Sequence, residues 1–304
     1  WLAALFGGFT SDFWVAEAFP FLSMYSNPHF CLGMALIMEF FILLNEQQPP
    51  RSLFWLILKG LTLAIVLPFG VVLAGMVGLG VQIWDLIQKS KPIRWWAALF
   101  LGPAVIAIGY QYLTVQADPF LSSWNMQNTS VTGPIWDTLI SFSPAFVMAG
   151  AAIFLLLRMK SAGKYKILVV WTIAGLALAY FPYELQRRFL QGYFIPLASL
   201  AGVAINQFIK DYSPKYYRII PVVLGLSFLT NILILAGGGG AIRGLDESVY
   251  YPKELDAAMA WMQTNLAPKE VVLAPPKISL LIPGHTGARV VYGHPDETPD
   301  SERR

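Results

Sequence analysis

The chain has 304 residues, of which 56% are hydrophobic and 13% are charged, and its mean hydropathy is +0.55. A soluble domain typically carries about twice that share of charged residues, so the composition indicates a polytopic membrane protein and argues against an ordinary soluble fold. The net charge of +3 is too small to indicate nucleic-acid binding, and the single cysteine, Cys31, excludes an internal disulfide and a cysteine-based zinc site.

Apolar runs separated by short polar breaks predict a series of helices. The predicted helices are 30–45, 53–67, 71–87, 95–113, 145–157, 167–181, 193–209 and 219–237. Residues 1–9 resemble the end of another spanning helix, so the chain is interpreted as a fragment that lacks upstream membrane helices. Segments 10–29 and 114–144 are expected to be loops.

The second and third runs are short for full membrane crossings. Runs 53–67 and 71–87 are separated by Pro68, Phe69 and Gly70, and Pro68 is expected to break the helix. The pair is therefore predicted to form either a tight hairpin that crosses and returns or a partly re-entrant pair.

The predicted type of structure changes after the glycines at 237–240. Residues 1–240 are predicted to form the transmembrane helix bundle, and residues 241–304 a small α/β appendage that is itself truncated. The appendage combines a helix over 252–266 with short strands at 270–274 and 289–293. The predicted fold class is an all-α polytopic membrane helix bundle with a small C-terminal extracytoplasmic α/β segment.

The distribution of basic residues predicts the orientation of the helices. Four short connections, at 46–52, 88–94, 158–166 and 209–218, contain 11 of the 21 Lys and Arg residues. If these connections face the cytoplasm, the positive-inside rule places the long loops and the C-terminal segment outside.

Arg187 and Arg188 depart from this rule. They lie in YFPYELQRRFLQGYFIPL, residues 180–197, on the predicted non-cytoplasmic side. Paired guanidinium groups suit a phosphate or pyrophosphate, because they offer several charge-assisted hydrogen bonds in one plane. The alternative is structural: one arginine extends to lipid headgroups while the other pairs with Glu184.

The outer loop at 10–29 combines acids with aromatic rings. Asp12, Glu17 and His29 lie among tryptophan, phenylalanine and tyrosine residues in 10–29. Aromatic faces stack on sugar rings, and a carboxylate can act as a general base. The alternative is an interfacial aromatic belt with solvated acids. Within the apolar runs, Glu39 is expected to pair with Lys59, and a role in a proton relay is the alternative.

Two further segments contain polar candidates. The long loop 114–144 contributes Asp118, Trp124 and Asn125. The sequence PGHTGARVVYGHPDET near the C-terminus contains His285, His294, Asp296 and Glu297, which suggest either metal ligands or a turn-rich surface. The second interpretation is favoured, because the histidines flank a predicted strand.

Several short motifs together resemble a known superfamily. SDFWVAEAFPFLSMYSNPHF, VLPFG, DPFLSSWNMQN, ELQRRFLQGYFIPLASLAG and IPGHTGARVVYGHPDET resemble bacterial multi-span glycosyltransferases of the GT-C superfamily, related to protein mannosyltransferases and lipid A aminoarabinose transferases. The resemblance covers most of the chain. It implies a hexosyltransferase that takes a sugar from a polyprenyl-phosphate donor on the extracytoplasmic face.

The resemblance also assigns roles to residues. It implies that Arg187 and Arg188 bind the donor phosphate. The catalytic acid of such enzymes usually lies in the first outer loop, which this fragment is expected to lack, so Asp12 and Glu17 are either the catalytic candidates or secondary site residues. The site-lining candidates are His29, Glu184, Gln186, Asp118, Trp124 and Asn125.

The expected partners are membrane lipid, the polyprenyl-phosphate sugar donor and a glycan, lipid or protein acceptor, in a bacterial inner or plasma membrane. The sequence does not require a divalent metal and does not exclude one. Two other functions remain open. A transporter or flippase of lipid-linked glycans is disfavoured because the chain has one proline-broken hairpin and no second copy. A non-catalytic anchor for the C-terminal segment predicts that Arg187 and Arg188 tolerate substitution.

Overall fold

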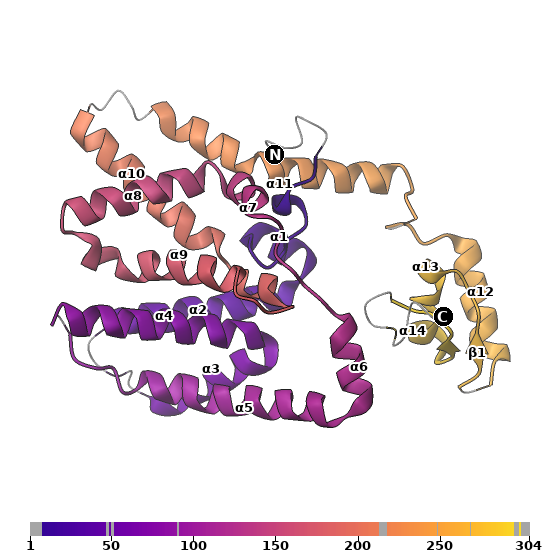
Figure 1. The fold of residues 1–304 in the computed structure, drawn as a ribbon. Coiled ribbons are helices and arrows are strands. Elements are labelled where there is room, and N and C mark those ends of the chain that lie inside the picture. The colour runs from indigo at the N-terminus through magenta and orange to yellow at the C-terminus, as the bar shows by residue number, and fades with distance from the viewer. Residues whose placement is uncertain are drawn as a thin grey trace. The chain divides into compact units, whose positions relative to one another are not determined.

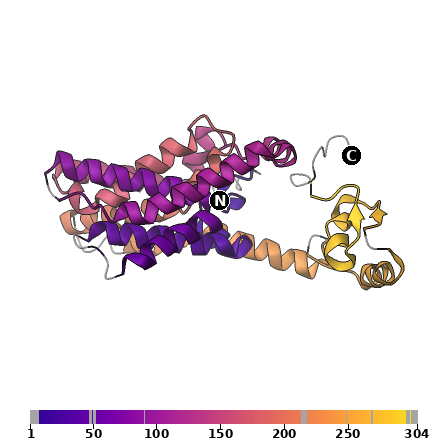
Figure 2. The same ribbon diagram turned by 90° about the horizontal axis from the view of Figure 1, so that it is seen from below.

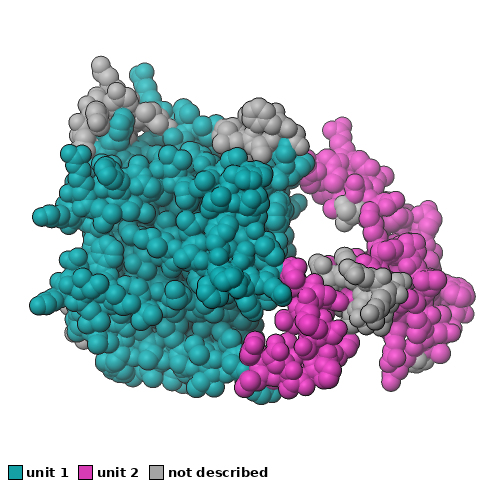
Figure 3. All heavy atoms as spheres, in the orientation of Figure 1, with its two compact units in different colours: residues 1–111, 130–234 teal, residues 112–129, 235–304 magenta. Residues whose placement is uncertain are grey.

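A computed structural model describes residues 8–46, 49, 52–89, 91–212, 218–247, 249–267, 269–294 and 298. Most of these residues are helical. The chain divides into two compact units, residues 1–111 with 130–234 and residues 112–129 with 235–304, which Figure 3 shows in separate colours. The expected helix end at 1–9 lies almost entirely outside the described residues.

The elements follow one another along the chain in the order drawn in Figure 1. They are η2 (Ser11–Phe13), α1 (Pro20–Ser26), α2 (Pro28–Asn45), α3 (Leu53–Val66), α4 (Pro68–Ile87), α5 (Ala97–Ala117), α6 (Pro119–Gln127), α7 (Ile135–Phe142), α8 (Ala145–Arg158), η3 (Ala162–Tyr165), α9 (Lys166–Ala179), η4 (Gln186–Leu190), α10 (Phe194–Tyr212), α11 (Ile219–Arg243), α12 (Lys253–Asn265), β1 (Val271–Val272), α13 (Pro276–Ser279), α14 (Ile282–Thr286) and β2 (Arg289–Val290).

The long helices of the first unit lie side by side, as Figures 1 and 2 show. α8 packs on α10, α10 on α9, α9 on α4, and α4 on α2 and α3. One hydrophobic core lies between α2, α3, α4, α5 and α9, where Phe40 stacks on Phe100 at 4.5 Å between ring centroids. A second core lies between α8, α9 and α10 around the fully buried Tyr193 and Leu197.

The helix α2 pairs with α3 through charged side chains as well as through apolar packing. Lys59 on α3 forms an ion pair with Glu39 on α2, as the sequence predicted. About a third or more of each side chain is exposed, 33% for Lys59 and 42% for Glu39. A single charge within an apolar membrane segment is costly, so the pairing allows both side chains to lie in these helices.

Five described helices are long and apolar enough to cross a membrane, and there are six if α7 and α8, which bend by 87°, are counted as one span. Two of them contain few buried residues: 11% of the most apolar stretch of α5 is buried, and 6% of that of α11. A large exposed apolar surface is disfavoured in water and favoured in lipid. The described helices therefore support the predicted multi-pass membrane protein.

Some expected loops and breaks are helical. Segment 114–144, expected as a loop, contains α6 and α7, and segment 10–29 contains η2 and α1. The helix α11 continues through the glycines at 237–240 and ends at Arg243. Pro68 is the first residue of α4, a position where its missing N–H costs nothing, so the expected break separates α3 from α4.

The C-terminal part of the second unit has a small core of its own. Met259 on α12 is buried against Ile282 and Ala288, and Leu255 and Met262 pack beside it. The expected strands shorten to β1 and β2, which pair in parallel over two residues each. Among the described residues this pairing is the whole of the sheet.

Candidate functional site

Arg187 meets a carboxylate from a distant part of the chain. It lies on η4, immediately after α9, and its Nη2 atom is 3.5 Å from Oε1 of Glu17 in the loop before α1. The side chains are 24% and 7% exposed, respectively. The structure thus brings together one residue expected to bind phosphate and one expected to act in catalysis. The ion pairs found among the described residues do not include the expected alternative partner, Glu184, whose side chain is exposed.

Both arginines lie against aromatic rings and keep an unused donor. The guanidinium carbon of Arg187 is 5.1 Å from the centre of the Trp14 ring, and that of Arg188 is 5.8 Å from the centre of the Phe69 ring. The Nε–H group of each arginine is buried and has no hydrogen-bond partner. Such groups are uncommon in folded proteins because each loses its hydration without replacement. An anion that reached these arginines would supply the missing acceptors.

Backbone hydrogen bonds hold three distant segments in place around the arginines. The N–H of Gly192 donates to the Glu17 carbonyl at 2.8 Å, and that of Phe194 donates to the Ala18 carbonyl at 3.1 Å. The N–H of Arg187 donates to Ser130 at 3.0 Å. Gly192 has a φ of +62°, which glycine adopts without strain, so the turn between η4 and α10 places Glu17 beside η4.

Asp12 is a second buried carboxylate in the same loop. It is 5% exposed and accepts hydrogen bonds from the hydroxyls of Thr10, at 2.5 Å, and of Thr230 on α11, at 2.6 Å. Its neighbour Ser11 donates its backbone N–H to Asp137 on α7 at 3.3 Å, and the Ser11 hydroxyl also bonds to Asp137. The hydroxyls of Thr10, just before η2, and of Thr230, on α11, therefore hold the Asp12 carboxylate in one orientation.

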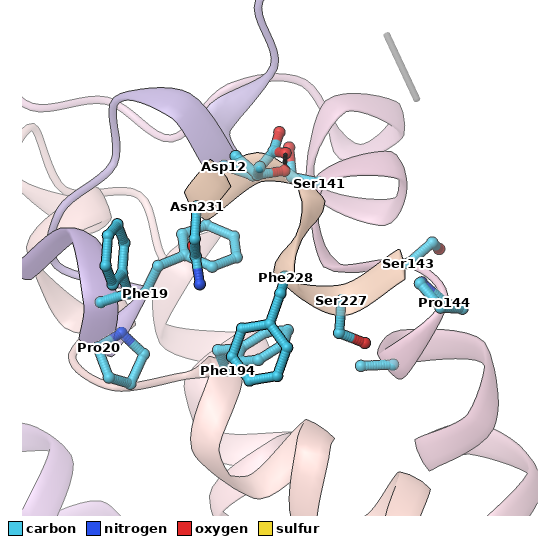
Figure 4. Close-up of a pocket in the computed structure, with 13 residues that line it drawn as sticks. Asp12, Phe19, Pro20, Ser141, Ser143, Pro144, Phe194, Ser227, Phe228 and Asn231 are labelled. Atoms are coloured by element: carbon cyan, nitrogen blue, oxygen red, sulfur yellow. Dashed lines mark hydrogen bonds between the residues drawn. The ribbon is translucent and has the colours of Figure 1, made fainter. Parts of the chain in front are cut away.

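Asp12 lines a cavity of about 270 Å³, which Figure 4 shows in close-up. Phe19, Phe194 and Phe228 form much of its wall, and Asp12 and Ser141 lie together at one end. The Ser141 hydroxyl is buried and has no partner. Ser143 and Ser227 line the cavity away from Asp12, so polar groups lie at several points of a mostly apolar wall, as is typical of small-molecule sites. Asn231 on α11 also lines this cavity.

The remaining candidates lie at several places. His29 is exposed on the first turn of α2, next to the ring of Phe30. Gln186 begins η4, directly before Arg187. Asp118 caps α6 by accepting from the N–H groups of Phe120 and Leu121, a structural role, and Trp124 and Asn125 lie on the same helix in the second unit.

Sequence reasoning did not place Asp137 and Ser141 in the site. Both lie on α7, within the segment expected to be a loop, and both are at most 7% exposed. The only indication in the sequence that these residues belong to a site was the presence of an acid and a hydroxyl in a polar segment. Of the metal candidates near the C-terminus, Asp296 and Glu297 lie outside the described residues. In the part of the chain that is described, no group of three or more His, Cys, Asp or Glu side chains is arranged to hold a metal ion.

No family model, curated protein or solved structure matches this chain.

Proposed function

We propose that the protein is a membrane glycosyltransferase that moves a sugar from a polyprenyl-phosphate donor to an acceptor on the extracytoplasmic face of a bacterial inner membrane. The observation that carries this proposal is the group formed by Arg187, Arg188 and Glu17. It combines two cations that have unused buried donors with a buried carboxylate. The motif resemblance described above supplies the reaction class.

The donor phosphate would meet Arg187 and Arg188. A charge-assisted hydrogen bond between an arginine and an anion is typically about 2.7–2.9 Å long. The 3.5 Å separation of Arg187 from Glu17 is longer, so this ion pair is weak enough to exchange for a phosphate oxygen. The guanidinium groups would then stabilise the negative charge that develops on the leaving phosphate.

The same exchange would release Glu17 for proton transfer. An acceptor hydroxyl oxygen bonds to the anomeric carbon of the sugar, the bond between that carbon and the phosphate oxygen breaks, and polyprenyl phosphate leaves with the electron pair. The hydroxyl proton goes to a carboxylate, for which Glu17 is placed best among the described residues. Asp12, whose cavity is apolar along most of its wall, would orient the acceptor or lipid instead.

Arg188 gives the sharper test, because Arg187→Ala also leaves Glu17 buried without its ion pair. Membranes that contain equal amounts of the wild type, Arg188→Ala or Arg158→Ala are supplied with labelled polyprenyl-phosphate hexose, and both binding and transfer are measured. Arg158 is a matched control because it is an exposed arginine at the end of α8. We expect Arg188→Ala to lower transfer by about a hundredfold, as does the loss of one transition-state donor elsewhere.

The control variant, Arg158→Ala, should bind and transfer the donor as well as the wild type does. Equal transfer by Arg188→Ala and the wild type would contradict the phosphate role of Arg188. If the wild type binds the donor and moves it between leaflets but does not transfer the sugar, the protein would be a transporter instead. A protein that neither binds nor transfers the donor would favour the anchor function.

A further inference from the structure

A buried cluster of charges at another end of the first unit has more positive than negative charge. Asp85 on α4 is 2% exposed and accepts from Nη2 of Arg94 at 2.9 Å and from Nζ of Lys166. Arg94 and Lys166 are also buried. Two cations therefore share one carboxylate. Removing an uncompensated charge from water is costly, so a cluster of this composition favours a further anion.

Arg94 has one polar atom to spare within this cluster. Its Nε atom donates to the backbone carbonyl of Glu46 at 3.4 Å, a long hydrogen bond, and its backbone N–H donates to Gln82 at 2.8 Å. Its Nη1 atom is buried and has no hydrogen-bond partner. The side chain of Glu46 itself is exposed. The arginine is thus held firmly but is not fully satisfied.

The cluster borders a cavity of about 450 Å³ whose described lining contains three lysines, Lys91, Lys160 and Lys166, and one carboxylate, Asp85. This volume is typical of small-molecule sites. Burial, followed by the positive charges of Lys166 and Arg94, lowers the pKa of Lys91, and Asp85 only partly opposes the effect.

The short 3-10 helix η3 also borders the cavity. Two of its residues, Ala162 and Gly163, line it. Gly163 has open space where a side chain would be, so a ligand can approach this backbone closely.

We propose that this cavity, which we call the lysine cavity, binds a phosphate group. The three lysines of its lining favour an oxyanion, and Arg94, which does not line the cavity, adds positive charge beside it through the ion pair with Asp85. None of these residues belongs to the Arg187 site. The phosphate can come from an anionic phospholipid headgroup or from a soluble phosphate. The lipid source has a structural reason: Lys166 also lines an apolar cavity of about 350 Å³ with Phe41 and Trp171, where an acyl chain could lie.

Lys160 provides a variant with an unusually close control. It is exposed, lines the lysine cavity, and has a φ of +53° just after the C-terminal end of α8. Lys89 is also exposed and has a φ of +47° just after the end of α4, but it is not part of the lining. Lys160→Gln and Lys89→Gln remove the same charge from the same backbone conformation. Both side chains are exposed, so both variants are expected to fold.

The experiment has two arms. In the first, the purified protein is titrated with sodium phosphate against sodium chloride of equal ionic strength, and binding is measured by calorimetry. In the second, the protein is placed in phosphatidylcholine nanodiscs with or without phosphatidylglycerol, and retained lipid is measured by native mass spectrometry. We expect Lys160→Gln to weaken binding about fivefold, the typical effect of one lysine on an anionic lipid surface, and Lys89→Gln by less than twofold.

If the two variants differ in binding affinity only in the phosphate arm, the ligand is a soluble phosphate. If they differ only in the lipid arm, the ligand is a phospholipid. A difference in both arms would support a site that accepts either. Equal losses of binding affinity in the two variants would overturn the proposal, because they would reflect the general surface charge rather than binding in the cavity. Absence of binding by the wild type in both arms would overturn it as well.

Discussion

Asp12 shows how single residues fix the geometry of the candidate site. Replacing it by alanine removes the acceptor for the hydroxyls of Thr10 and Thr230, both buried. Leaving buried polar groups without that acceptor typically costs about 1–3 kcal/mol. We therefore expect Asp12→Ala to lower the free energy of unfolding by this amount, measured by denaturant unfolding in detergent micelles.

The exposed Glu184→Ala should change that free energy by less than about 0.5 kcal/mol and serves as the control. Thr230→Val tests the mechanism, because its effect and that of Asp12→Ala should not add if the two side chains stabilise the protein through their shared bond. Equal stabilities of Asp12→Ala and Glu184→Ala would contradict this account.

The sequence indicated which residues of the site were unusual but could not pair them. Arg187 and Arg188 stood out because they violate the charge bias, and Glu17 because it is an acid among aromatic rings. The nearest acid along the chain, Glu184, seemed the natural partner of an arginine. The backbone bonds from Gly192 and Phe194 instead bring Glu17 to η4, and contacts between such distant segments leave no local pattern.

At the scale of helices, Gly60 is a residue whose lack of a side chain has a clear consequence. A Cβ atom at Gly60 on α3 would overlap the backbone carbonyl oxygen of Phe100 on α5. Backbone cannot move aside as a side chain can, so α3 and α5 would have to separate. We expect Gly60→Ala to destabilise the protein by about 1–3 kcal/mol, the usual cost of overpacking.

Gly75→Ala is the matched substitution, because a Cβ there meets nothing within 4 Å. Removing a glycine from a helix interior favours the helix by roughly 0.5–1 kcal/mol, so this variant should be slightly more stable than the wild type. Thermal unfolding of the two variants in the same detergent compares them directly. A Gly60→Ala variant as stable as Gly75→Ala would exclude close packing of the two helices at this point.

The long helices were predictable because apolar runs bounded by proline or charged residues define them locally. The short helices α6 and α7, of 9 and 8 residues, were missed because their mixed composition is typical of loops. The glycines at 237–240 suggested a change of structure, since each glycine costs a helix up to about 1 kcal/mol in water. They lie at the end of the most apolar candidate span, where internal hydrogen bonds are favoured because lipid offers no alternative.

For the molecule as a whole, the distribution of lysine and arginine predicts sidedness. Lys164 and Glu184 are exposed residues at opposite ends of α9, and Trp261 is 61% exposed on α12. Single cysteines at these positions, in a Cys31→Ser background, can be labelled with a membrane-impermeant maleimide. From the outer side we expect labelling of Glu184→Cys and Trp261→Cys, and from the inner side labelling of Lys164→Cys.

Labelling of Lys164→Cys and Glu184→Cys from one side would contradict a membrane-crossing α9. Labelling of Trp261→Cys together with Lys164→Cys would place the C-terminal segment inside. The predicted class of protein followed from composition, which is a property of the entire chain. The packing order of α8, α10, α9, α4 and α2 could not follow, since it depends on how side chains of separate helices fit together.

The buried cluster around Asp85 also has a consequence for the order in which the protein is made. Arg94 lies nine residues after Asp85, whereas Lys166 lies 81 residues after it. At a synthesis rate of roughly 5–20 residues per second, Lys166 leaves the ribosome several seconds after Arg94. Arg94 is therefore available to pair with Asp85 before Lys166 has been made, and the second cation of the cluster is added only with α9.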